Sequence, residues 1–474
     1  MEEKITPRKF TTKGRVYWGL ASFGGALISG IYASLLPIFM VDYLGLVESA
    51  GLVVLMQVIY AIWNALNDPI FGILSDRSRS KKGRRIPFMR YTAPFLGIFF
   101  VLVWFAPAGS TDLTLFWWLL ITTLLYDTAY TIVFLVYSAL LPEITESEPE
   151  RNKLSLYASF FSLIGMILGF VVPELFRQGA DLFPLQMAMI AVALIGVGLI
   201  MLTTYKFQER LEFSVLDEPL GIWAMIVNTF KRKAFDILVI ANFMSVFLQS
   251  LILGSIFYLA DYITQTSSLI LLVFLFLPLI AGIWLTPIMI KKLGVVRSDQ
   301  ILLVIGGIGL VLLTFVPVSL IYVCIAVAAF GFVGPLVFTN VMFAQVADED
   351  ELKSGVRREG MFFGMNALIT KPAQSLAVIV PTILLAITGF IPRSDTGGIP
   401  RPDLQPPEAL FAIRAFTGLI PGLALLAEAV ILFAYPLKGA YWKEVQERVL
   451  ILHDEKHQKL KEMQRTSEGT NNNS

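Results

Sequence analysis

The sequence is poor in the side chains that bind metal ions or form covalent cross-links. Its 474 residues include one cysteine and two histidines. Because Cys324 stands alone in an apolar run, an intrachain disulfide and a cysteine-based zinc site are excluded. His453 and His457 lie four residues apart in a polar C-terminal segment, which is more typical of a solvated helix face than of a metal pair. We therefore expect no resident metal or cofactor.

Charge is also scarce. Only 15% of the residues are Asp, Glu, Lys or Arg, whereas an ordinary soluble domain has roughly 25%. Hydrophobic residues make up 56% of the chain, and the mean hydropathy is +0.71. The 37 basic and 36 acidic residues leave a formal charge of +1, so no charge bias suggests nucleic acid as a partner. This composition excludes an ordinary soluble protein and predicts one that contacts membrane lipid.

Long apolar runs recur along the whole chain. A helix that crosses a bilayer needs about 20 mostly apolar residues. Measured against that length, the sequence predicts twelve transmembrane helices, and hence an all-α membrane protein. The predicted helices span residues 17–41, 50–74, 87–106, 114–140, 153–175, 183–205, 234–258, 267–290, 299–317, 319–347, 359–390 and 407–435.

The basic residues indicate how these helices cross the membrane, because Lys and Arg in short loops stay on the cytoplasmic side. Residues 1–16 hold five Lys or Arg and show no signal-peptide cleavage site, so we expect a cytoplasmic N-terminus. All but five of the 37 basic residues then fall in cytoplasmic segments, and the C-terminus is cytoplasmic too. One exception, Lys371, falls inside the eleventh predicted helix. The other four lie on the outer side and need only a topological explanation: Arg177, Arg393, Arg401 and Arg414.

The chain divides into two similar halves. The long polar segment 206–233 reads as a cytoplasmic linker between six-helix bundles at 17–205 and 234–435. LPEITESEPERNK before the fifth helix and VADEDELKSGVRREG before the eleventh both place acidic residues ahead of basic ones. Repeated halves are typical of transporters in which one bundle rocks against the other.

The C-terminal segment 436–474 is polar overall but has one apolar stripe. Val445, Val449 and Leu452 fall on one helix face. We therefore predict a cytoplasmic amphipathic surface helix followed by a disordered tail.

A motif with regularly placed glycines and basic residues, GILSDRSRSKKGRRIPF, follows the second predicted helix. Glycine permits close helix approach or a turn, aspartate can pair with arginines, and the basic run anchors the loop among anionic headgroups. Basic loop residues alone would satisfy the positive-inside rule, but that rule does not account for the spacing. We expect a gating loop formed by Gly72, Asp76, Arg77, Gly83, Arg84 and Arg85.

This spacing resembles the loop between helices 2 and 3 of the major facilitator superfamily, in the form typical of the glycoside, pentoside and hexuronide cation symporters, the melibiose permease family. WNALNDPIFG, residues 63–72, is similar to that family's cation-site motif. LPEIT with Arg151, and the later DEDE and RREG, are similar to its two inter-repeat loops. The resemblance covers nearly the whole chain and implies the major facilitator fold of two six-helix bundles working by alternating access.

The resemblance also implies cation-coupled symport of a small molecule, with a sugar or glycoside as the first candidate substrate. We expect a monomer in the plasma (cell inner) membrane. An enzyme is not expected, because the sequence shows no nucleophile and base pair, no phosphate-cradling loop and no metal cluster. A carrier of lysolipid-like amphiphiles and a non-transporting membrane sensor remain alternatives.

Few ionisable residues lie inside the predicted helices. Each costs about 2.5 to 3.5 kcal/mol at a helix centre, so each needs a partner or a task. Asp68 on the second helix, Asp127 on the fourth and Lys371 on the eleventh could neutralise one another where the bundles meet. Cation binding and substrate passage would then compete for the same charges. Glu174 and Glu428 are lesser candidates, which we expect to be interfacial or hydrogen-bonded.

Structural roles are open for the same residues. Asp68 and Lys371 could form a permanent pair, but buried pairs stabilise poorly, so we favour a functional role. Asp127 could equally serve a helix–helix hydrogen bond. Aromatic stripes pack the core more often than they bind substrate.

The family pattern is matched at Asn67, Asp68, Tyr130, Thr131 and Lys371. We expect a cation site at Asn64, Asn67, Asp68 and Thr131, with Asp127, one turn before Thr131, as a helper that supplies negative charge. We expect the substrate and coupling residues to be Tyr130, Phe134, Tyr137, Lys371 and Gln374, of which Tyr130 and Lys371 match the family pattern.

The sequence departs from the family pattern at both sites. Asn64 stands where the family usually has a second acid, which leaves Na⁺ and H⁺ both open as the coupling ion. The family's polar sugar-binding groups are replaced by Ala26, Phe134, Ser138 and Ser159.

Overall fold

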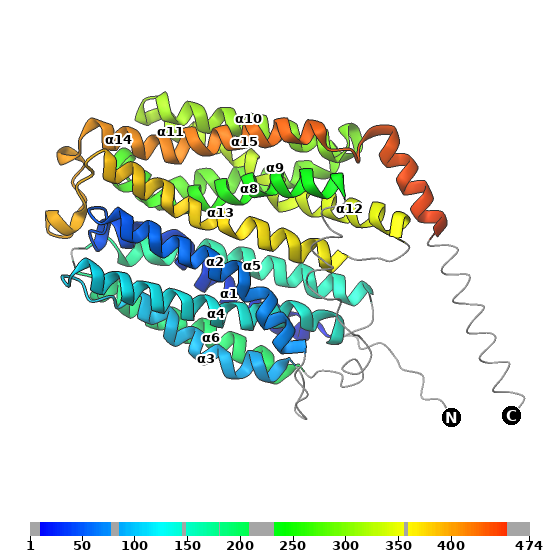
Figure 1. Cartoon of the computed structure of the whole chain (residues 1–474), viewed down its shortest axis with the longest axis horizontal. Helices are drawn as coiled ribbons and strands as arrows, with labels where there is room; N and C mark the ends of the chain where they lie inside the picture. Colours follow the sequence, from blue (N-terminus) through cyan, green and yellow to red (C-terminus); the bar gives the residue numbers. More distant parts are fainter. Residues whose placement is uncertain are drawn as a thin grey trace, which may run out of the picture.

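The computed structural model describes residues 10–76, 85–144, 148–179, 181–207, 232–354 and 359–452. These residues are helical almost throughout, and no strand occurs in them. Twelve of the helical spans are long and apolar enough to cross a membrane. The expectation of an all-α membrane protein with twelve spans is therefore confirmed, and the helices run side by side in one bundle (Figure 1).

The first six spans agree with the predicted apolar runs to within a few residues at most ends. The π-helical turn η1, Phe39–Tyr43, continues the first of them. The six helices are α1 (Thr12–Ile38), α2 (Ala50–Asp76), α3 (Ile86–Trp104), α4 (Asp112–Ile144), α5 (Glu148–Phe176) and α6 (Phe183–Lys206).

The other six spans follow the same pattern with more interruptions. They are α8 (Lys233–Tyr258) with η3 (Leu259–Thr264), α9 (Ser268–Leu293), α10 (Val295–Phe315), α11 (Val318–Ala328) with η4 (Ala329–Phe332), η5 (Gly334–Phe338) and α12 (Thr339–Ser354), α13 (Glu359–Ile387), and α14 (Pro407–Arg414) with η8 (Ala415–Leu419) and α15 (Ile420–Ile431).

The tenth span is broken, although its apolar run predicts a single helix. Between α11 and α12 the backbone passes through a 3-10 turn, η4, and a π turn, η5. Pro335 lacks the backbone N–H of a regular helical turn, so the i to i−4 ladder is interrupted here. Apolar periodicity does not detect such a break, because the residues of the two turns themselves, AFGF and GPLVF, continue the apolar run.

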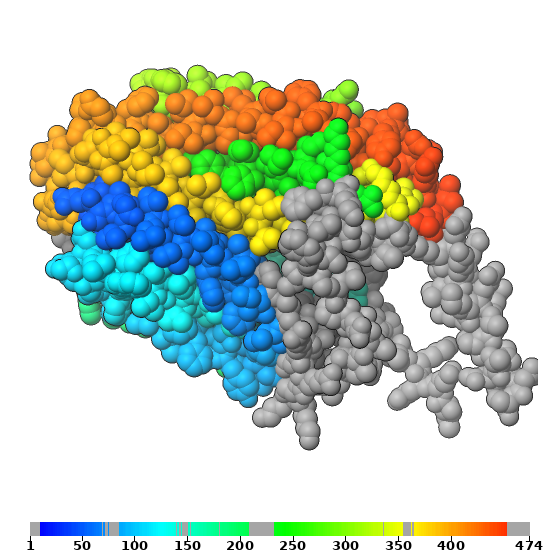
Figure 2. Space-filling view, in the orientation of Figure 1, coloured from blue at the N-terminus to red at the C-terminus, as the bar shows by residue number. Residues whose placement is uncertain are grey.

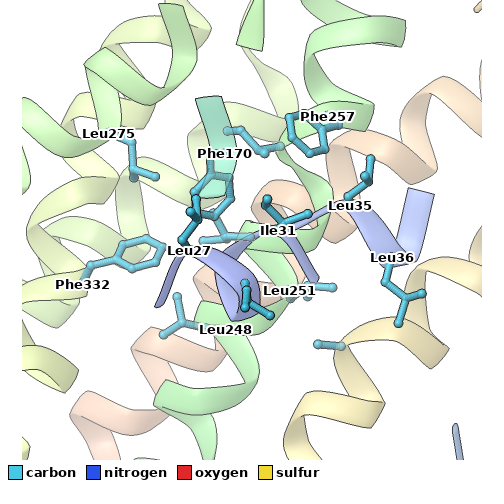
Figure 3. Packing of buried hydrophobic residues seen from close by; sticks show 14 of the residues in the cluster. Leu27, Ile31, Leu35, Leu36, Phe170, Leu248, Leu251, Phe257, Leu275 and Phe332 are labelled. Carbon is cyan, nitrogen blue, oxygen red and sulfur yellow. The ribbon is translucent and has the colours of Figure 1, made fainter. Parts of the chain in front are cut away.

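α1 lies at the centre of the molecule. Its Leu27, Ile31 and Leu35 pack toward Phe170 of α5 and Leu251 of α8, which brings side chains of both halves together (Figure 3). α1 also approaches α5 so closely that a side chain on a glycine of α5 would clash with the α1 backbone.

The two halves also meet along α2 and α13. In the space-filling view the blue surface of α2 adjoins the yellow surface of α13 (Figure 2). The candidate site described below lies on these two helices.

α6 ends at Lys206 and α8 begins at Lys233, so most of the predicted linker 206–233 lies outside the described residues. A helix covers residues 439–452, within the predicted amphipathic segment. Val445 and Val449 are buried, and the Tyr441 hydroxyl donates a hydrogen bond to Glu349 Oε1 of α12 at 2.8 Å. The apolar face of this helix therefore packs against the protein.

Candidate cation-binding and gating sites

An ion pair joins the two halves in the middle of α2 and α13. Lys371 Nζ lies 2.7 Å from Asp68 Oδ1 and donates a hydrogen bond to the backbone oxygen of Asn64 at 3.0 Å. Thr131 Oγ1 of α4 donates to the same Asp68 oxygen at 3.3 Å. The Asp68 and Lys371 side chains are 29% and 18% exposed, so both remain partly accessible. The structure thus brings together the acid and the base that the sequence places inside different predicted helices.

Asp127 lies beside this pair and is buried. Its carboxylate accepts hydrogen bonds from Asn67 Nδ2 at 2.9 Å and from the Tyr60 hydroxyl at 3.1 Å. Asn67 Oδ1 is buried and has no hydrogen-bond partner in the described part of the chain. An unpartnered buried oxygen next to two carboxylates is a position where a donor or a cation would be stabilising.

The charges of this group do not balance. Two carboxylates, Asp68 and Asp127, face one ammonium group, Lys371, so the three groups carry one net negative charge when ionised. Carboxylate, hydroxyl and amide oxygens are the ligands that hard cations prefer. One monovalent cation would neutralise the group and would supply Asn67 Oδ1 with a partner.

Asn64 and Gln374 extend this polar group toward the second half. Asn64 Nδ2 donates to Gln374 Oε1 at 3.5 Å, a long hydrogen bond. Asn64 is buried, whereas Gln374 is exposed. The Gln374 amide group is therefore accessible, about one helical turn from Lys371 on the same face of α13.

The aromatic residues of α4 that are predicted to bind substrate mainly make packing contacts. Tyr137 stacks on Trp18 of α1, and its hydroxyl donates to the Trp18 backbone oxygen at 2.8 Å. The Phe134 ring lies over α1 so closely that a Cβ on Gly25 would overlap its Cζ. Tyr130 packs against Phe134, with ring centroids 4.6 Å apart. These contacts are those of helix packing, and the substrate role of the three residues stays a prediction.

Three of the six predicted gating-loop residues belong to the described part of the chain. Gly72 and Asp76 lie in the last turns of α2, and Arg85 is the N-cap residue of α3. Arg77, Gly83 and Arg84 lie outside the described residues. The gating role of this loop therefore stays a prediction.

A second charged group, at the end of the molecule that carries α14, was not predicted from the sequence (Figure 1). We call it the distal cluster, and it consists of Asp42, Glu174, Arg177, Asp261 and Arg393. Arg177 binds Asp261 with two hydrogen bonds of 2.5 and 3.0 Å and donates to Glu174 at 2.8 Å. Arg393 donates to Asp42 at 2.8 Å and to Asp261 at 2.6 Å. Both arginine side chains are at most 2% exposed, so neither is a loop residue of purely topological importance.

The distal cluster joins the halves reciprocally. Arg177 follows α5 of the first half and binds Asp261 of the second, whereas Arg393 of the second half binds Asp42 of the first. Tyr262 donates to Asp42 at 2.7 Å, and Tyr43 donates to the Arg177 backbone oxygen at 2.8 Å.

A repeated sequence signal marks this cluster. An Asp-Tyr pair ends the first span of each half, in VDYL and ADYI, and an arginine follows the fifth span of each half. Comparing equivalent positions of the halves would have found it.

Twelve spans in two halves, with an ion pair at their interface and a second charged cluster at one end, define a secondary transporter of the major facilitator type. The family model described as MFS/sugar transport protein matches residues 17–439, and the chain belongs to that family.

Two relatives illustrate this membership. An uncharacterized symporter of Synechocystis sp. is 27% identical over 96% of this chain and 100% of its own length. A glucuronide carrier protein homolog of Escherichia coli is 24% identical over 82% of this chain and 85% of its own length.

Solved structures agree in fold. The nucleoside transporter NupG superposes with a TM-score of 0.58 at 15% identity, covering 88% of this chain and 99% of that one. A bacterial homolog of the human lysosomal transporter Spinster gives a TM-score of 0.61 at 13% identity, covering 94% and 99%. At these identities the likeness concerns the fold alone.

Proposed function

We propose that this protein couples movement of a sugar or glycoside to a monovalent cation, with Na⁺ as the first candidate and H⁺ as the alternative. Family membership and the names of the relatives, a symporter and a glucuronide carrier homolog, support this. The observation that carries the proposal is the Lys371 to Asp68 ion pair, which crosses the interface of the halves beside Asp127.

In this proposal the cation and Lys371 compete for Asp68. A cation held by Asp68, Asp127, Thr131 and Asn67 Oδ1 reduces the charge of the two carboxylates from −2 to −1, and this weakens their attraction for the ammonium group. Lys371, freed from Asp68, and the neighbouring Gln374 then become available to substrate hydroxyl groups. Because the competing groups lie on α2 and α13, cation binding changes the attraction between the halves.

The distal cluster is the proposed outer gate. It holds the first half to the second through two arginines, so the structure represents a state closed at that end. Opening requires Arg177 to leave Asp261 and Arg393 to leave Asp42. This assignment places the start of α1 and the helix at residues 439–452 on the cytoplasmic side of a plasma or cell inner membrane.

A second substrate class has a specific observation in its favour. Phe134 occupies the family's sugar-binding acid position and covers Gly25 with an apolar ring. Such a surface suits a lysolipid-like amphiphile better than a free hydroxyl group. Binding measured side by side for glycosides and lysolipids separates the two classes.

The cation site is tested by thermal unfolding of the purified protein in detergent, with sodium exchanged for choline at constant ionic strength. We expect sodium to stabilise the wild type by about 2.7 kcal/mol at a hundred times its dissociation constant. Asp68→Asn should abolish that stabilisation. Asp403→Asn is the matched control, because Asp403 pairs with Arg401 at an exposed position and should leave the sodium effect unchanged.

The alternatives give different results. No sodium effect, together with a pH response of stability that is larger in the wild type than in Asp68→Asn, would indicate proton coupling at this site. A protein indifferent to both ions, or an Asp68→Asn variant with the wild-type response, would contradict the proposed site.

A further inference from the structure

Two carboxyl groups lie buried in the second half, away from the interface site. Asp299 of α10 is 0% exposed and Glu428 of α15 is 2% exposed. The residues that follow them in the chain are in contact, because Gln300 Nε2 donates a hydrogen bond to the Ala429 backbone oxygen at 3.0 Å. This bond holds α10 and α15 side by side next to the two carboxyl groups. Charges on the two carboxylates repel each other.

The pair has almost no hydrogen-bond donors. Ser245 Oγ of α8 donates to Glu428 Oε1 at 2.6 Å. Both oxygens of Asp299 and Oε2 of Glu428 are buried without a partner in the described part of the chain. Ionised carboxylates with three unpartnered oxygens are energetically costly to bury. Protonation of one carboxyl group lowers this cost, because a protonated carboxyl can donate a hydrogen bond to the other.

No described cation neutralises the pair. Arg414 of α14 donates instead to the Val316 backbone oxygen, and Asp236 of α8 is a further acid. On α12, Glu349 pairs with Lys353 and Asp350 pairs with Arg232. The basic residues on the elements around Asp299 and Glu428 are solvent-exposed and form no described ion pair with either acid: Lys233 of α8, Lys291 and Lys292 of α9, and Arg297 of α10.

Asp299 also lies against the break in the tenth span. A Cβ on Gly334, the first residue of η5, would clash with Asp299 Oδ1. The carboxyl group therefore packs onto π-helical backbone, and π turns of this kind occur frequently at functional sites.

We propose that Asp299 and Glu428 form a proton-binding site that carries one proton at neutral pH. Two ionised carboxylates without a cation or a full set of donors are not stable in a membrane-embedded bundle, whereas one carboxylate and one carboxylic acid are. The site lies among α8, α10, α15 and η5 and shares no residue with the group formed by Asp68, Asp127 and Lys371. Proton binding here therefore involves different side chains from those of cation binding at the interface.

Infrared spectroscopy of the purified protein at neutral pH tests the proposal, because a protonated carboxyl has its own C=O stretching band. The difference spectrum between wild type and Asp299→Asn, and between wild type and Glu428→Gln, should contain this band, with a shift in deuterated buffer. Asp403→Asn, at an exposed ion pair, should give no such band. Asp127→Asn identifies any carboxyl signal that belongs to the interface site.

A second measurement counts the proton. Because the folded pair would hold one proton that the unfolded chain releases at neutral pH, wild-type stability should fall as pH rises from neutral, and it should fall less steeply in Asp299→Asn. Both substitutions keep the shape of the side chain, and Glu428→Gln keeps an oxygen acceptor for Ser245. Folded variants with no carboxyl band difference from wild type, or an unchanged pH slope, would overturn the proposal.

Discussion

Single charged residues in this protein gain their roles from partners on other helices. Asp68 and Asn64 could be selected from the sequence because their spacing places them on one face of an apolar helix. Lys371 stood out because no topological explanation accounts for it. For Arg177 and Arg393 the prediction of a purely topological role is wrong, because each pairs with an acid of the other half, 84 and 351 residues away in the chain. Pairing between such distant residues is not visible in the neighbouring sequence, although the repeat of Asp-Tyr and Arg in the two halves marks it.

Glu150, outside the membrane spans, allows a prediction about pH. Its carboxylate accepts hydrogen bonds from Arg15 Nε at 2.7 Å and from the Phe10 backbone N–H at 3.3 Å. The Arg15 guanidinium lowers the pKa of Glu150 below its usual value of about 4.3, so the folded state favours the carboxylate. The resulting stabilisation is complete above the unfolded-state pKa and is lost as pH falls through the lower folded-state pKa.

Glu150→Gln should therefore reduce the free energy of unfolding by about 1 kcal/mol near neutral pH. The difference from wild type should shrink at about pH 4 and below, as measured by thermal unfolding across pH. Glu444→Gln removes an exposed helical ion pair with Arg448 and should cost almost nothing. An equal effect of the two substitutions, or a pH-independent cost, would argue against this account of Glu150.

At the level of helices, glycine decides how closely α1 approaches α5. Gly165 of α5 faces the α1 backbone at Phe23, where a Cβ would clash with the backbone oxygen, and Gly169 faces Gly30 in the same way. Small residues permit such close contact between membrane helices, where packing replaces the hydrophobic effect. The sequence predicts both helices, but it does not indicate which of the 35 glycines lies at a contact.

Gly165→Val should destabilise the protein by about 1 to 3 kcal/mol, because the new side chain cannot fit against the α1 backbone. Gly198→Val is the matched control, since a Cβ on Gly198 meets nothing within 4 Å. Thermal unfolding in detergent measures both variants. If the two variants were equally stable, α1 and α5 would have moved apart to accept the new side chain without a loss of stability, and this account of the contact would be wrong.

Across the whole molecule, the halves repeat both their helices and their charged contacts. Arg15 binds Glu150 at 2.7 Å in the first half, and Arg232 binds Asp350 at 2.7 Å in the second. Both pairs join the first span of a half to an acidic cluster that the sequence repeats. At the distal end, the residues that repeat in the two halves pair with each other across the interface. The internal repeat therefore also supplies the contacts that connect the halves.

The distal cluster should control opening of that end. Asp261→Asn removes the carboxylate shared by Arg177 and Arg393, and breaking buried ion pairs costs about 3 to 5 kcal/mol, enough to shift a closed state toward an open one. Spin labels at Glu48→Cys and Ser394→Cys, in a Cys324→Ala background, should show a longer distance in Asp261→Asn. Asp403→Asn, which changes an exposed pair, should keep the wild-type distance. An unchanged distance in Asp261→Asn would exclude a gating role.

The sequence by itself determined the class of this protein, its twelve spans and the ionisable residues inside those spans. Hydropathy and side-chain periodicity depend on neighbouring residues, so these features could be predicted locally. Only the tertiary structure decided that Asp127 binds Asn67 and Tyr60, that Arg177 and Arg393 link the halves, and that Asp299 lies beside Glu428 without a cation in the described part of the chain. These are contacts between distant segments, and the packing of helices in three dimensions determines which polar groups meet.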